Sequence, residues 1–108
     1  MATESQPQTA ILALEGEIDL HRSPEVKDTL APLIARKTPR ILVDFSAVTY
    51  IDSSGLAAMI ETLQRIQSYG GKFAMFGLRE SVKAVFEIAR LDQIFRLFPD
   101  EAAAVAGA

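Results

Sequence analysis

The sequence predicts an α/β fold in which mainly parallel strands alternate with helices. Short apolar segments such as residues 40–45 and 72–76 alternate along the chain with segments whose apolar residues recur at helical spacing. This alternation is typical of a sheet whose strands are joined by helical crossovers. The chain has 108 residues and no cysteine. This length is enough to bury a core without disulfides, so we expect one domain over residues 1–108.

The first half of the chain contains an early strand and a helix. Residues 1–8 are polar and are expected to form a flexible leader, whereas residues 9–14 fit a buried strand. Gly16 predicts a bulge or bend, and Ile18 provides a further inward residue, so we count a second short strand here. A helix then begins at Ser23-Pro24-Glu25 with serine as its cap, and its apolar residues recur to about residue 36.

The second half continues the alternation. Residues 40–45 form the clearest strand, and an apolar stripe over residues 56–66 predicts a helix that ends at Gly70-Gly71. Residues 72–76 are the next strand, a helix follows around residues 82–89, and residues 94–98 are the last strand. The alanine-rich tail, residues 99–108, has helical propensity but few large side chains, so it is either loosely docked or disordered.

Composition and charge exclude several functions. The net charge is −3 and the lysine and arginine residues are dispersed, so no nucleic-acid partner is expected. The apolar runs are too short to span a bilayer, and the polar start lacks the apolar region of a signal peptide, so we expect a cytoplasmic protein that does not enter the membrane. No metal-binding pattern or complete phosphate-binding loop occurs, and we expect no cofactor.

The most informative segment is Ile-Asp-Ser-Ser-Gly-Leu-Ala at residues 51–57, between a strand and a helix. Unpaired N–H groups at a helix N-terminus favour the oxygens of Asp52, Ser53 and Ser54, or a phosphate. Helix capping alone would explain these residue types. Two consecutive serines exceed what one cap needs, and Gly55 would keep the surface low for a partner. The turn is therefore interpreted as a helix cap and also as a site for regulatory phosphorylation. These two interpretations are compatible, because one serine can cap the helix while the other is modified.

The same segment does not have the pattern of an enzyme. A hydrolase nucleophile elbow requires Gly-x-Ser-x-Gly, and here Asp52 and Leu56 flank Ser54 at the glycine positions. The single histidine, His21, lies in a polar loop and is expected to be an exposed loop residue. Asp44, at the end of the clearest strand, is interpreted as a turn-forming acid and not as a phosphoacceptor. We therefore expect no catalytic residues and a protein that is not an enzyme.

The chain resembles the STAS domain family, specifically the stand-alone bacterial anti-sigma factor antagonists. The resemblance depends on residues 41–56, Ile-Leu-Val-Asp-Phe-Ser-Ala-Val-Thr-Tyr-Ile-Asp-Ser-Ser-Gly-Leu, and on Gly-Glu-Ile-Asp at residues 16–19. Gly-Gly-Lys at residues 70–72 and Leu-Asp-Gln-Ile-Phe at residues 91–95 are also similar to family members. The resemblance implies a mixed sheet of four to five strands packed with about four helices.

The resemblance also implies a partner-switching function in signal transduction and transcription regulation. Ser54 would be phosphorylated by a serine kinase that is also the anti-sigma factor, and a serine phosphatase would reset the switch. The unphosphorylated antagonist would bind the kinase through Asp19, Asp52, Ser53, Ser54, Gly55 and Leu56. Asp52 would help to position the serine hydroxyl. The alternatives are a STAS adaptor for another target, such as a phosphatase or a lipid-transport ATPase, and a nucleotide-binding STAS module.

Overall fold

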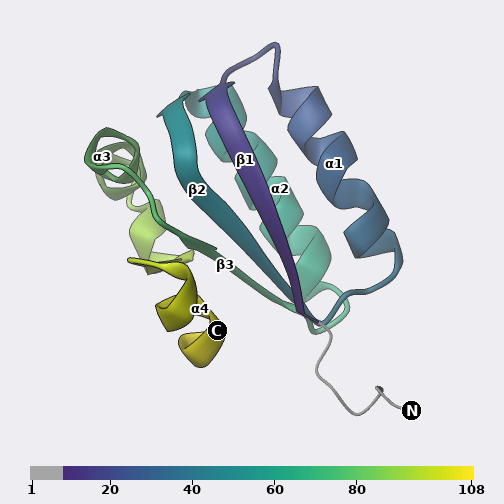
Figure 1. Cartoon of the computed structure of the whole chain (residues 1–108). Helices are drawn as coiled ribbons and strands as arrows, with labels where there is room; N and C mark the ends of the chain where they lie inside the picture. Colours follow the sequence, from purple (N-terminus) through teal and green to yellow (C-terminus); the bar gives the residue numbers. More distant parts are fainter. Residues whose placement is uncertain (1–8) are drawn as a thin grey trace.

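The computed structural model describes residues 9–108, which form four strands, four α-helices and one 3-10 turn (Figure 1). The expected leader, residues 1–8, lies outside the described residues. The elements follow one another in this order: β1 (Thr9–Ile18), α1 (Ser23–Ala35), β2 (Arg40–Ile51), α2 (Ser53–Gln67), β3 (Lys72–Phe76), α3 (Glu80–Ile88), the 3-10 turn η1 (Leu91–Gln93), β4 (Arg96–Phe98) and α4 (Glu101–Gly107). The predicted α/β class is confirmed.

The four strands form one sheet in the order β1-β2-β3-β4, and every neighbouring pair is parallel. The expectation of a mixed sheet is therefore not met among residues 9–108. The two early strands predicted from the sequence are one strand of 10 residues, β1. Its register against β2 shifts between Ala13 and Glu15 and between Gly16 and Glu17, and Gly16 has a φ of +75°. The predicted irregularity at Gly16 is confirmed as a bulge that β1 passes through without ending.

Strand β2 is longer than its apolar sequence predicts. It continues past Phe45 to Ile51 because its second half pairs with residues 15–18 of β1. Val48 and Ile51 are buried in this extension, whereas the residues between them are exposed. Asp44 consequently lies inside the strand and does not end it; its carboxylate accepts a hydrogen bond from the N–H of Ser46 at 2.8 Å.

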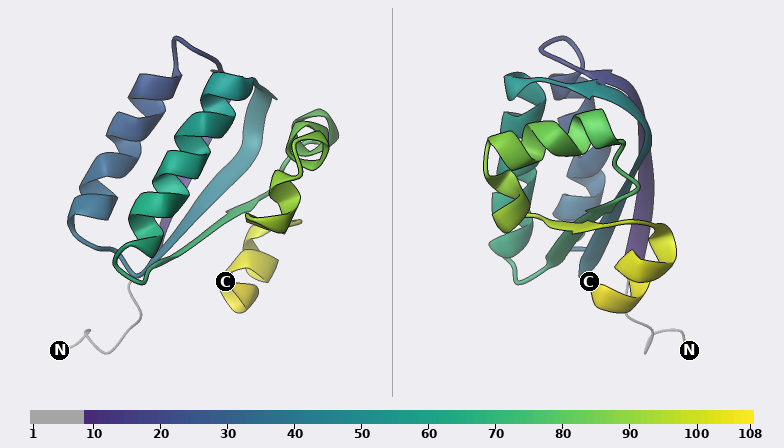
Figure 2. Two further views of the ribbon diagram at one scale, coloured as in Figure 1. Left: turned by 180° about the vertical axis from the view of Figure 1, so that it is seen from behind. Right: turned by 90° about the vertical axis from the view of Figure 1, so that its left-hand side faces the viewer.

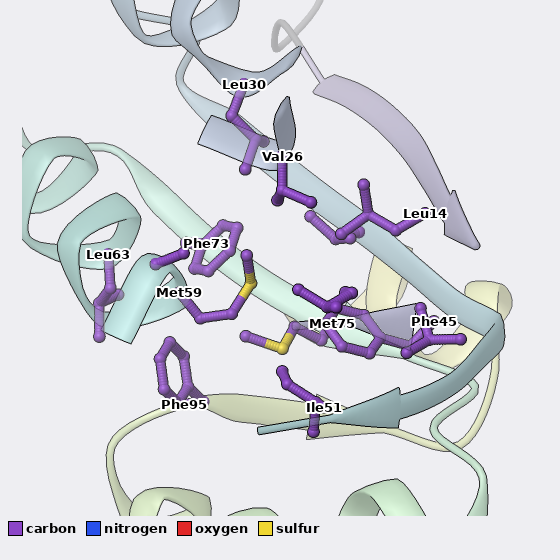
Figure 3. Close-up of a cluster of buried hydrophobic side chains, with 14 of the residues drawn as sticks. Leu14, Val26, Leu30, Phe45, Ile51, Met59, Leu63, Phe73, Met75 and Phe95 are labelled. Atoms are coloured by element: carbon purple, nitrogen blue, oxygen red, sulfur yellow. The ribbon is translucent and has the colours of Figure 1, made fainter. Parts of the chain in front are cut away.

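Helices cover the two faces of the sheet unequally. Figure 2 shows α1, α2 and α3 on one face and the short α4 on the other. The larger core lies between the sheet and the first three helices, as Figure 3 shows for Val26, Leu30, Met59 and Phe45. The helix α4 forms a smaller core on the opposite face, where its buried Ala104 packs against Leu42, Ala74 and Phe76. The sheet is thus a middle layer, buried on both faces where α4 lies.

Aromatic side chains connect the end of the chain to the main core. Phe86 of α3 contacts Phe45 of β2 and Phe95, edge to face, with ring centroids 6.1 and 5.6 Å apart. Phe95 also meets Phe73 at 6.2 Å in the same geometry. Such pairs contribute beyond the area that they bury. They hold α3 and η1 against the sheet and thereby set the point at which β4 begins.

The tail that follows β4 contains α4. The Asp100 carboxylate accepts a hydrogen bond from the N–H of Ala103 at 2.9 Å and caps the start of this helix. At the other end, the Arg40 guanidinium donates to the carbonyl of Val105 at 2.6 Å. A cation at the C-terminal carbonyls of a helix also opposes its dipole favourably. Both ends of α4 therefore have polar partners, and its middle is buried at Ala104.

Candidate functional site

The candidate site lies where β1 and β2 end, at the C-terminal edge of the parallel sheet. Ile18 pairs with Ile51 in the last step of the register, and the N–H of Asp52 donates to the carbonyl of Ile18 at 3.3 Å. Asp19 and Asp52 each follow the last residue of their strand. The fold therefore brings together two acidic residues that are far apart in the sequence. The C-terminal edge is also where open α/β sheets usually place their binding sites.

Asp52 is the cap of α2. Its Oδ1 accepts hydrogen bonds from the N–H groups of Ser54 at 2.9 Å and Gly55 at 3.1 Å, and its backbone is extended. These bonds satisfy two of the N–H groups that a helix start leaves unpaired. Helix capping is therefore the role that the structure gives to Asp52. Its carboxylate contacts the backbone of Ser54, and the cap does not require either serine.

The two serines occupy the first two positions of α2. Ser53 is exposed and Ser54 is partly buried. Because Asp52 provides the cap, both hydroxyls are available for other partners. The positive end of the helix dipole lies beside them, and a phosphate is well tolerated at this place. Ala57, one turn later, is exposed and has only a methyl group as its side chain.

Gly55 faces the interior and not the surface. An added Cβ would lie 2.5 Å from the Ile18 carbonyl oxygen and 2.6 Å from Cγ1 of Ile51. The glycine thus lets the first turn of α2 approach the ends of β1 and β2, a physical reason different from the low outer surface inferred from the sequence. Leu56 is also partly buried and packs on the main core. Of the six predicted residues, Gly55 is buried, Ser53 is exposed, and the other four are partly buried.

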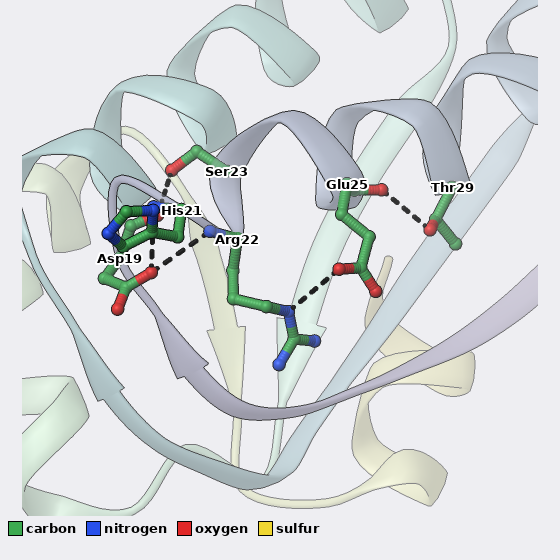
Figure 4. A network of polar contacts seen from close by, with 6 residues as sticks. All are labelled: Asp19, His21, Arg22, Ser23, Glu25 and Thr29. Atoms are coloured by element: carbon green, nitrogen blue, oxygen red, sulfur yellow. Dashed lines mark hydrogen bonds and ion pairs between the residues drawn. The ribbon is translucent and has the colours of Figure 1, made fainter.

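Asp19 organises the turn that leads into α1 (Figure 4). Its Oδ1 accepts hydrogen bonds from the N–H groups of His21 and Arg22, both at 3.0 Å. Its carbonyl accepts from the Ser23 hydroxyl at 2.7 Å and from the Ser23 N–H at 2.9 Å. The predicted serine cap of α1 is wrong, because the Ser23 hydroxyl donates backwards and the helix has no side-chain cap. Asp19 holds the loop before α1 much as Asp52 holds the start of α2.

Sequence reasoning missed two exposed apolar side chains beside the site. Leu20 directly follows Asp19 and is 68% exposed, and Tyr50 directly precedes Ile51 and is 49% exposed. Exposed large apolar groups next to polar residues are a common feature of protein interfaces. A leucine in an otherwise polar loop was the signal available in the sequence.

Among residues 9–108, no group of three or more His, Cys, Asp or Glu side chains is placed to hold a metal ion. Over the same residues, none of the helices has the length and apolar character required to cross a bilayer. The candidate site residues at the edge of β1 and β2 provide two carboxylates, which accept hydrogen bonds from backbone N–H groups, and two serine hydroxyls. This arrangement is suited to modification and recognition.

The fold and this turn define a STAS domain. The model of the STAS domain family matches residues 1–104, and the chain belongs to this family. Among curated proteins, the anti-sigma-B factor antagonist of Staphylococcus aureus (strain NCTC 8325) is 26% identical over 95 residues, which are 88% of each chain.

Solved structures agree with this assignment. A crystal structure of a candidate anti-sigma factor antagonist from Thermotoga maritima is 25% identical, with a TM-score of 0.86 over 92% of this chain and 86% of that chain. The Bacillus cell fate determinant SpoIIAA in its phosphorylated form has a TM-score of 0.70 over 94% of this chain and 91% of that chain. Its identity is 19%, so this likeness concerns the fold alone.

Proposed function

We propose that this chain is an anti-sigma factor antagonist whose binding state is set by the phosphorylation of Ser54. In its unphosphorylated form it binds an anti-sigma factor that is also a serine kinase, and phosphorylation releases this partner. The observation that carries the proposal is the position of Ser54 as the second residue of α2, with its hydroxyl spared from capping by Asp52. The names of the relatives support an anti-sigma factor as the partner, and its kinase activity is part of the proposal.

The physical effect of the modification supports a switch. A phosphate adds about −1.5 to −2 charges at neutral pH. On Ser54 this charge would be added beside Asp52 and at the edge that also carries Asp19. The amide end of α2 stabilises the charge in the free protein, whereas a partner that covers the turn would bury it. Burial of an uncompensated charge costs several kcal/mol, which lowers affinity by orders of magnitude.

The proposed contact surface consists of Asp19, Asp52, Ser53 and Ser54, bordered by the exposed side chain of Leu20. Gly55 and Leu56 contribute by shaping the turn from within. A serine phosphatase completes the cycle, and both reactions take place in the cytoplasm, where the kinase has ATP. The chain itself performs no chemistry in this scheme and acts only as a binding partner.

An affinity experiment tests the proposal with three baits: the wild type, Ser54→Asp and Ser68→Asp. The Ser68 variant carries the same change at the exposed far end of α2, so it is the matched control for added charge. We expect the wild type and the control to recover a serine-kinase-type ATPase from a lysate of the source organism, and Ser54→Asp to lose it. Recovery of the same partners by all three baits would contradict the switch.

A second step identifies the modified atom. The recovered kinase is incubated with ATP and either wild type or Ser54→Ala, and the phosphate is located by peptide mass spectrometry. We expect one phosphate on Ser54 and none on the variant. A phosphate that persists on Ser54→Ala would move the site to Ser53 or to another residue.

A further inference from the structure

A hollow of about 420 Å³ opens at the N-terminal edge of β3 and β4, at the opposite end of the strands from Ser54. The loop between α2 and β3, the segment between η1 and β4, and the end of α4 surround it. The side chains relevant here are Leu63, Gln67, Lys72, Phe73, Ile94 and Arg96. None of these residues belongs to the candidate site at Ser54.

The hollow exists because β4 is shorter than β3. Strand β4 begins at Arg96, which lies opposite Ala74, whereas β3 begins two residues earlier at Lys72. On the other side, Lys72 and Phe73 pair with Arg40 and Ile41 of β2. The start of β3 therefore has a neighbouring strand on one side only. The missing strand length leaves the space open, and the backbone arrangement forms it without a ligand.

The walls of the hollow combine an apolar surface with positive charge. Leu63 and Phe73 are buried side chains of the main core, and Ile94 is 56% exposed at the mouth. Lys72 and Arg96 are both exposed. The Arg96 guanidinium lies 5.6 Å from the ring centroid of Phe98, a cation–π distance that restrains its position.

Neither cation takes part in an ion pair in the part of the chain that the structure describes. The ion pairs between residues 9 and 108 are Arg22 with Glu25 and Lys27 with Glu61, so neither Lys72 nor Arg96 is paired there. The chain as a whole has a net charge of −3, which makes a cationic hollow a local exception. A basic group that faces a cavity next to apolar walls favours an anionic group on the ligand.

We propose that this hollow binds an amphipathic anion: a small molecule with one carboxylate, sulfonate or phosphate group on an apolar body. The apolar body would lie against the exposed side chain of Ile94 and the accessible edges of Leu63 and Phe73, and the anionic group would bind Lys72 and Arg96. Gln67 supplies an amide for a further hydrogen bond. The volume is in the range of ordinary ligand pockets, roughly 300–1,000 Å³. This inference is independent of the proposed switch at Ser54.

The probe for this test is 8-anilinonaphthalene-1-sulfonate, an aromatic anion whose fluorescence rises in apolar surroundings. Titration of the folded full chain is expected to give a saturable rise that weakens with added salt. Lys72→Glu and Arg96→Glu should each weaken binding about tenfold, the loss of one charge-assisted contact. Lys83→Glu, an exposed lysine on α3 outside the hollow, is the matched control and should leave binding unchanged.

An uncharged relative of the probe, N-phenyl-1-naphthylamine, separates the apolar from the charged contribution. Its binding should be equal in wild type and in both charge-reversal variants. Dodecanoate should displace the anionic probe, whereas inorganic phosphate, which lacks an apolar body, should not. Displacement by phosphatidylglycerol vesicles but not by dodecanoate would assign the surface to a membrane and overturn the proposal of a free small molecule.

Amide shifts in ¹H–¹⁵N spectra locate the bound probe. We expect the largest changes at Gly70, Gly71 and Lys72, which line the hollow. Largest changes at Ser53 or Gly55, or equal affinity in wild type and Lys72→Glu, would overturn the proposal. Because Lys72 and Arg96 are exposed, both variants should fold. Thermal melting by circular dichroism checks this, and Lys72→Gln or Arg96→Gln replaces the variant at the same position if that variant does not fold.

Discussion

The close approach of α2 to β1 makes Gly55→Ala the most direct test of how the candidate site is built. The added Cβ would lie 2.5 Å from the Ile18 carbonyl oxygen, whereas real Cβ atoms essentially never come under 3.0 Å. The obstacle is backbone, so no side-chain rotation relieves it. The first turn of α2 must move away from β1 by about half an ångström, and with it Ser54 and the cap at Asp52.

The magnitude follows from two opposing terms. Overpacking of a well-packed contact costs about 1–3 kcal/mol. Alanine is favoured over glycine in a helix by up to about 1 kcal/mol, and this gain is smaller in the first turn. Gly55 does not have a positive φ, so no backbone strain is added. We expect a net loss of about 1–2 kcal/mol in the free energy of unfolding, or roughly 5–10 °C in Tm.

The assay is urea unfolding followed by far-ultraviolet circular dichroism, together with thermal melting. Gly71→Ala is the matched control, since its Cβ would lie 2.7 and 2.8 Å from atoms of Tyr69 and Ile66 that belong to side chains. Ile66 is fully buried and the Tyr69 hydroxyl is bonded to Thr38, so this variant should lose stability as well, but without a shift of the first turn of α2. If Gly55→Ala unfolds at the same urea concentration as wild type, the packing explanation for this glycine is refuted.

Three further predictions concern polar contacts. Asp52→Ala removes the cap of α2 and should lower the free energy of unfolding, measured in urea, by about 1 kcal/mol. Asp52→Asn keeps a capping oxygen and should retain most of this stability, so equal losses in the two variants would argue against capping. Arg40→Met removes the donor to the end of α4, so amide exchange over Glu101–Gly107 should accelerate while the rest of the sheet keeps its protection, and unchanged exchange would show that the contact is dispensable. Burial raises the pKa of Tyr69 above its ordinary value of 10.0. The folded state therefore holds this proton more tightly than the unfolded state, and the resulting stability is complete below pH 10.0 and declines as the pH rises through the folded pKa. The difference in unfolding free energy between wild type and Tyr69→Phe should narrow above that pH, and a constant difference would contradict this linkage.

Local patterns predicted much of the fold. Strand β3 occupies Lys72–Phe76 as its apolar run indicated, and the apolar stripe that follows the serines lies within α2. The bulge at Gly16 was also visible, because its position needs a positive φ that glycine adopts freely. These predictions were correct because periodic burial and backbone preference depend on residues that are close together in the sequence.

Pairing over long distances explains where sequence reasoning was incomplete. Residues 46–51 have a mixed polar pattern and were not assigned to the strand, yet they extend β2 because the second half of β1 pairs with them. The sequence did not decide whether the tail, residues 99–108, docks loosely on the domain or is disordered. Its alanines give little apolar area, and what holds α4 is the fit of Ala104 on Leu42 and the bond from Arg40.

In the candidate site, too, local patterns predicted some features and the folded structure was needed for others. The sequence indicated that Asp52, Ser53 and Ser54 share a helix start, and the structure places them there. It did not indicate which oxygen caps the helix, because several residues in the turn have a suitable side chain. Only the assembled turn shows the Asp52 carboxylate on the amides of Ser54 and Gly55.

By itself, the sequence determined that the protein is an α/β domain with a serine-bearing turn between a buried strand and a helix, since hydrophobic period and turn chemistry are local properties. The tertiary structure decided that the sheet is parallel throughout residues 9–108, that Gly55 faces inward and that Asp19 lies at the same edge as Asp52. The first depends on the pairing of all four strands, and the other two depend on contacts between β1 and the segment from β2 to α2. Such contacts arise from packing in three dimensions, and no local pattern encodes them.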